Sequence, residues 1–161
     1  MSQTIGGTIE SASLKDLLRS EVPLFKSLKQ PDADQLLLYF KGKTLSAGEV
    51  LWREGDEIEY LAYVLSGKIE LKKETEFKGK QFIVGLLTAG AMTGGLTFFN
   101  EGKSSLTVEV LEDCLLAVLE GKDYRRLEEE RPDLALFLVK NMLMAVSLRL
   151  QRSYERFAAI F

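Results

Sequence analysis

The stretch Leu45-Ser-Ala-Gly-Glu-Val-Leu-Trp-Arg-Glu-Gly-Asp56, followed by Tyr63-Val-Leu-Ser-Gly-Lys-Ile-Glu-Leu71, decides the fold. In both segments, short apolar runs are separated by polar turns that contain glycine. Many short strands at intervals of about 8–12 residues, punctuated by such turns, are typical of closed antiparallel sandwiches and barrels. The two segments therefore predict a compact β-unit.

The same pattern of short apolar runs and glycine-containing turns extends in both directions, from about residue 42 to about residue 120. Within this range we predict an antiparallel double-stranded β-helix, that is, a jelly-roll-like β-roll. Its strands are expected at Val50–Trp52, Tyr60–Leu65, Lys68–Lys73, Gln81–Leu87, Leu106–Val110 and Cys114–Leu119.

Helical patterns lie on both sides of this unit, so the predicted fold class is α+β. Residues 1–11 are polar and contain glycine, and we expect them to be disordered. The domain is expected over residues 12–161, and it begins with helices that contain Leu14 and Leu18 on one side. A long C-terminal helix is predicted over 132–158, because Pro132 suits a first helical turn and neither Gly nor Pro occurs from Asp133 to Phe157.

The long C-terminal helix carries two apolar stripes. A heptad-type stripe predicts a helix–helix seam; its members are Leu136, Val139, Leu143, Val146, Leu150 and Phe157. A second stripe lies beside the first; its members are Leu134, Leu138, Met142 and Ala145. One apolar face is expected to cover the β-unit, and the other is expected to contact a partner. A helix with this much apolar circumference is seldom exposed, so the pattern predicts a homodimer formed through this helix.

Composition excludes several classes of function. The chain has 161 residues, one domain by length, and its 21 basic and 24 acidic residues give a net charge of −3. A domain with a net negative charge is not expected to bind the phosphate backbone of nucleic acid, so no direct DNA binding is expected. The absence of histidine removes His-based nucleophile pairs and His-ligated metals. The single cysteine, Cys114, lies in an apolar run and is expected to be an inert buried thiol.

Together these residues resemble the cyclic-nucleotide-binding domain of the catabolite activator protein superfamily. The two quoted segments match the family's two turn signatures, and Leu115–Leu119 matches its last strand. The resemblance covers about residues 12–157. It implies a regulatory, ligand-sensing module in signal transduction rather than an enzyme. Family transcription factors carry a helix-turn-helix after the long helix, and no such unit is expected before Phe161, unless the chain is a truncated piece.

The family's phosphate-binding cassette is only partly matched. A Phe-Gly-Glu motif there opens a short helix whose amides hold the cyclic phosphate, and an Arg about ten residues later pairs with that phosphate. Here Gly94 is kept, but Gly95 stands in place of the Glu and Ser104 in place of the Arg. By resemblance, the candidate ligand-binding residues are Gly94, Gly95, Leu96, Thr97, Ser104 and Ser105.

Several alternatives follow from this altered cassette. Lys103 would replace the missing cation if its side chain turned inward, although strand alternation points it away from the pocket. The hydroxyl groups of Thr97, Ser104 and Ser105, with the free amides at Gly95–Thr97, offer sites for a neutral or weakly anionic ligand. A shifted loop would change the alignment. We therefore expect weak or altered ligand binding, with no certain cofactor and no metal. The other hypothesis is a dimeric scaffold with a decayed pocket that binds a protein partner.

The sequence also predicts where in the cell the protein is found. The N-terminus lacks a basic start followed by an apolar stretch, so no signal peptide is expected. The run Phe82–Leu96 is cut by glycines and is too short to span a membrane. These features, with a single cysteine, indicate a cytoplasmic protein without a membrane partner.

Overall fold

The computed structural model of the chain describes residues 11–95, 99 and 102–160. The expected N-terminal disorder concerns residues 1–10, which lie outside the described residues, and Ser11 is already the first residue of a helix. The described helices are α1 Ser11–Glu21, α2 Pro23–Lys26, α3 Gln30–Leu37, α4 Gly121–Glu130 and α5 Pro132–Ala158. The described strands are β1 Lys41–Leu45, β2 Val50–Trp52, β3 Tyr60–Glu74, β4 Gln81–Leu87, β5 Met92–Thr93 and β6 Thr107–Glu120.

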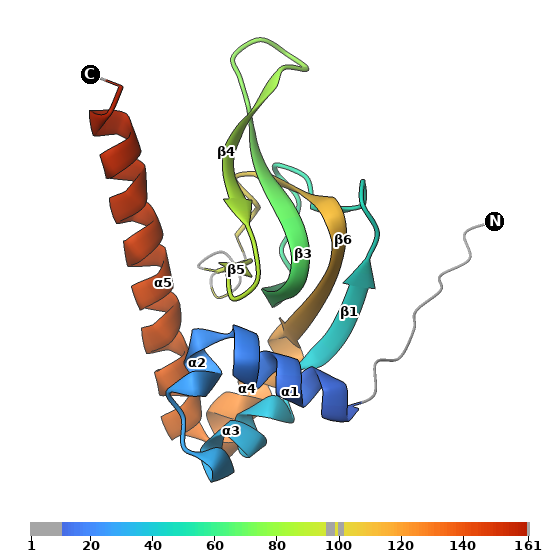
Figure 1. Ribbon diagram of the computed structural model, residues 1–161, viewed down its shortest axis with the longest axis vertical. Coiled ribbons are helices and arrows are strands. Elements are labelled where there is room, and N and C mark those ends of the chain that lie inside the picture. Colours follow the sequence, from blue (N-terminus) through green and yellow to red (C-terminus); the bar gives the residue numbers. More distant parts are fainter. Residues whose placement is uncertain (1–10, 96–98, 100–101, 161) are drawn as a thin grey trace, which may run out of the picture.

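The described strands form one antiparallel sheet built around two long strands. The order is β1-β6-β3-β4, while β2 also pairs with β6 and β5 with β3. The β3–β6 ribbon curls, and α1 to α4 gather at one end of it, while α5 stands beside β4 (Figure 1). The predicted α+β class, with an antiparallel β-roll and a long C-terminal helix, is confirmed.

Two pairs of predicted strands are in fact two continuous strands. The segments expected on either side of Gly67 are both part of β3, and those expected on either side of Leu111 are both part of β6. Gly67 has a φ of +87° and lies where the β3–β6 register shifts, between Ser66 and Lys68. It therefore forms a bulge inside a strand rather than a turn between strands.

Alternating side chains of β3 and β6 enter two different cores. Ala62 and Val64 lie inside the roll with Trp52 and Leu116, whereas Leu61 and Tyr63 pack against the helices. Successive residues of a strand point to opposite faces, so one ribbon supplies both cores. The roll and the helical layer are thereby joined by the same strands.

The two apolar stripes of α5 have different environments. Leu134, Leu138 and Met142 are buried in the core shared with α1 to α4 and one face of the sheet. In contrast, most of the heptad stripe is exposed, including Leu143 at 61% and Phe157 at 64%. Val146 is the member of this stripe that packs partly against the core. The N-terminal half of α5 is therefore anchored, and its outer face is open.

Candidate functional site

A cleft of about 1070 Å³ separates α5 from the edge of the β-roll. Its wall on the sheet side includes Leu71, residues 84–87 of β4 and Leu106, and its floor includes Met92 of β5. The helix wall is formed by α5 from Asn141 to Arg156, together with Ala159 just after the helix. The cassette predicted from the sequence starts directly after β5, but its described candidates Gly94, Gly95, Ser104 and Ser105 are not among the residues that line this cleft.

The first half of the cassette needs glycine at its start. Gly94 is buried with a φ of +83°, and a Cβ there would lie 2.5 Å from the Tyr60 carbonyl oxygen. Gly95 is less confined, because a Cβ there would lie 3.6 Å from Met92 Cε and 3.9 Å from Val146 Cγ2 of α5. Position 95 therefore lies next to the long helix. The other two candidates in this half, Leu96 and Thr97, lie outside the described residues.

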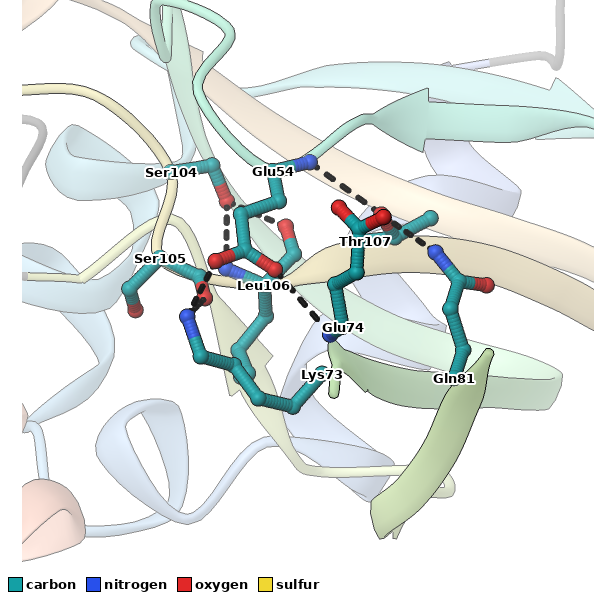
Figure 2. A network of polar contacts seen from close by, with 8 residues as sticks. All are labelled: Glu54, Lys73, Glu74, Gln81, Ser104, Ser105, Leu106 and Thr107. Atoms are coloured by element: carbon teal, nitrogen blue, oxygen red, sulfur yellow. Dashed lines mark hydrogen bonds and ion pairs between the residues drawn. The ribbon is translucent and has the colours of Figure 1, made fainter. Parts of the chain in front are cut away.

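The second half of the cassette is bonded mainly to itself. Ser104 is buried, and its hydroxyl donates to the Leu106 carbonyl at 2.6 Å. Its backbone N–H donates to the Asp56 carbonyl, and its own carbonyl accepts from the Gly55 N–H, both at 2.7 Å. Figure 2 shows the Ser104 hydroxyl directed at its own loop. Ser104 thus occupies the place expected for the cation but makes local bonds.

The cation beside this loop is already neutralised. Lys73 forms an ion pair with Glu54, and its Nζ also donates to the carbonyl of exposed Ser105 at 3.1 Å (Figure 2). The Lys73 ammonium lowers the pKa of the Glu54 carboxyl, which also accepts the Glu74 N–H at 3.1 Å. Lys103 is exposed and pairs through its backbone with Glu57. Neither lysine is presented to the cleft.

Sequence analysis missed three cations that line the cleft. Arg149, Arg152 and Arg156 all belong to its helix wall. Their spacing of i, i+3 and i+7 places them on one face of a helix, and this signal was present in the sequence. Arg149 is partly buried and its Nη2 donates to the Met92 carbonyl at 2.5 Å. The helix thus reaches the strand that leads into the cassette.

The described residues give no support to metal or thiol chemistry. No group of three or more His, Cys, Asp or Glu able to hold a metal occurs among them. The Cys114 thiol is buried, and this burial raises its pKa, which disfavours the reactive thiolate. None of the helices in the described ranges combines the length and apolar character needed to cross a membrane.

Comparisons with known proteins agree with the β-roll fold described above. Residues 42–131 match the family described as "Cyclic nucleotide-binding domain". The chain is 31% identical to the Cyclic AMP receptor protein of Thermus thermophilus over 124 residues, which are 74% of this chain and 57% of that protein. It is 28% identical to the cAMP-activated global transcriptional regulator CRP of Haemophilus influenzae, covering 71% of this chain and 51% of the relative.

A solved structure shows the likeness across nearly the whole chain. A cyclic nucleotide-binding domain from Methylobacillus flagellatus superposes with a TM-score of 0.83 at 19% identity, covering 98% of this chain and 89% of that one. At that identity, the likeness concerns the fold. The chain spans from 27% to 57% of the length of the curated relatives it matches. The matched residues 42–131 are more than half of the chain, and the protein therefore belongs to the cyclic nucleotide-binding domain family.

Proposed function

We propose that this domain is a non-enzymatic, ligand-sensing module of a regulatory protein, and that it binds ordinary cyclic nucleotides weakly. The observation that carries this proposal is the position of Ser104, whose buried hydroxyl is bonded within its own loop where the family has a cation. The Thermus relative is named a cyclic AMP receptor, which supports a small-molecule ligand for the same fold. A buried, unpaired Cys114 fits a reducing compartment such as the cytoplasm.

The expected weakening follows from the two replaced side chains. Loss of the charged partner of a buried anion costs about 2–5 kcal/mol. Loss of the Glu contact removes a hydrogen bond to a charged group, worth about 1.5–3 kcal/mol. Because about 1.4 kcal/mol corresponds to a tenfold change, affinity is expected to fall by roughly three to five orders of magnitude relative to an intact cassette.

Calorimetric titration of the purified protein with cyclic AMP and cyclic GMP tests this prediction. The expected result is no micromolar binding, with dissociation constants near or above about 1 mM. Micromolar binding of either nucleotide would contradict the proposal, because it would mean that Gly95 and Ser104 do not disable the cassette. A thermal-shift measurement with the same nucleotides checks the calorimetric result independently, since binding to the folded state raises Tm.

The exposed stripe of α5 supports a second candidate function, a dimeric scaffold that works through protein contacts. Positions 136, 139, 143, 146, 150, 153 and 157 alternate in steps of three and four, which is the spacing of a coiled-coil seam. A second copy of the same helix offers the complementary stripe, since a two-fold interface is self-complementary. We therefore propose that the domain is a homodimer through α5 under either function.

The dimer is tested by placing a charge on the stripe. Leu143→Glu is expected to convert a dimer into a monomer in sedimentation velocity, because the charge would be buried in the seam. Gln151→Glu is the matched control, since Gln151 is exposed on α5 and lies off the stripe. A wild-type protein that sediments as a monomer, or a Leu143→Glu protein that stays dimeric, would exclude this interface.

A further inference from the structure

Arg149 is a partly buried cation that has no carboxylate partner among the residues that the structure describes. Its guanidinium is partly buried in the wall of the cleft, and its recorded bond is to the Met92 carbonyl. The cleft is also lined by Glu21 and Glu155, but among the described residues neither forms an ion pair with Arg149. Burial lowers the pKa of Arg149, which nevertheless stays protonated at neutral pH.

The Arg149 guanidinium lies close to the start of the cassette, because it bonds to Met92. Met92 lies in β5, two residues before Gly94, so Arg149 approaches the start of the cassette from the helix side. A guanidinium has five N–H donors in a rigid fork, and one bond to a carbonyl leaves most of them available. Arg149 is half-buried and no nitrogen of its guanidinium is a buried atom without a partner, so the remaining donors are open to the cleft and available to an anion.

We propose that Arg149 binds the anionic group of the ligand from α5 and thereby offsets only part of the affinity that the cassette loses at Ser104. This inference rests on the proposed ligand-sensing function and identifies the cation of that same site. The planar fork suits a phosphate or carboxylate, which it can bind through two parallel hydrogen bonds. Arg152 and Arg156, on the following turns, add positive potential along the same wall.

The rest of the cleft indicates the other part of the ligand. The cleft is also lined by aliphatic side chains, Leu71 and Val84 from the sheet and Leu106 just before β6. Small-molecule sites commonly combine such an apolar wall with a few polar groups that fix orientation. The expected ligand is therefore a small molecule that carries one phosphate or carboxylate group on an apolar or ring-shaped body.

The side-chain Nε–H signal of Arg149 in a nitrogen–proton NMR spectrum provides the most direct test, and it remains readable when binding is weak. The signal is assigned from its absence in the Arg149→Gln protein. Three probes are used. Cyclic AMP carries both an anionic group and a ring-shaped body, inorganic phosphate carries the anion alone, and adenosine carries the body alone. We expect cyclic AMP to shift the signal saturably, phosphate to shift it at higher concentration, and adenosine to leave it unchanged.

Two variants test the same inference through affinity. Arg149→Gln is expected to weaken cyclic AMP binding at least tenfold, whereas Lys140→Gln, which removes an exposed charge from the same helix outside the cleft, leaves it unchanged. Arg149→Lys keeps the charge without the fork and is expected to fall between them. Backbone amide spectra of each variant verify that the fold is retained.

The outcomes separate this inference from the proposed function. Micromolar binding that is lost in Arg149→Gln would support the role of Arg149 while refuting weak binding. Weak binding that leaves the Arg149 signal unmoved and is unchanged in Arg149→Gln would overturn the inference while sparing the proposed function. Failure of both anions to shift the signal at concentrations up to about 10 mM would also overturn it, including the case in which a partner subunit neutralises Arg149.

Discussion

Gly67→Ala is expected to lower the free energy of unfolding by about 3–5 kcal/mol, from backbone strain together with overpacking. The residue has a φ of +87°, and a Cβ there would lie 2.2 Å from the Asp113 carbonyl oxygen and 2.7 Å from Cys114 Sγ. The neighbouring atoms belong to β6, the main partner of β3, so neither strand can yield without disturbing the ribbon that serves both cores. Urea denaturation followed by circular dichroism measures the loss.

Gly79→Ala is the matched control for this effect. Gly79 has a similar φ of +81°, but a Cβ there would meet nothing within 4 Å. The control therefore carries only the conformational penalty of a left-handed residue, about 1–2 kcal/mol. Equal losses in the two variants would mean that the close approach of β6 at Gly67 has no energetic weight.

Leu138→Ala is expected to reduce the free energy of unfolding by about 2–5 kcal/mol. Leu138 is fully buried in the middle of the anchored half of α5, within the core shared by the helices and the sheet. Truncation removes apolar contacts and leaves a cavity that the surrounding side chains fill only partly. The loss is read from the midpoint and slope of the same urea transition.

Leu38→Ala serves as the control for the same chemical change at an exposed site. The Leu38 side chain is 60% exposed at the end of α3, so its truncation is expected to change stability by no more than about 0.5 kcal/mol. A Leu138→Ala protein as stable as Leu38→Ala would show that the N-terminal half of α5 is not clamped in the core.

Much of the fold could be predicted from local sequence signals. The boundaries predicted for β4, Gln81 to Leu87, are those observed, because glycine and charged residues mark its start and a turn follows its end. Pro132 likewise marks the beginning of α5. The continuity of β3 through Gly67 could not be predicted, since a Ser-Gly-Lys sequence suits both a hairpin turn and a bulge. Only the pairing with β6, distant in sequence, decides between them.

The candidate site was less predictable, for a different physical reason. The resemblance located Gly94, whose positive φ and close approach to Tyr60 explain why glycine stands there. The position of Arg149 in the cleft could not be predicted, because whether an arginine is solvated or buried depends on what packs against it. Its bond to Met92 joins residues 57 positions apart, which no local pattern specifies.

The uneven anchoring of α5 gives the helix the mechanical character of a lever. Met142 is the last buried residue of the helix, and the arm from there to Ala158 is about 24 Å long at about 1.5 Å per residue. A tilt of only about 5° at the pivot would move the free end by about 2 Å. Arg149 lies partway along this arm, so a displacement of its guanidinium would be amplified at the tip, where Tyr154 and Phe157 are exposed.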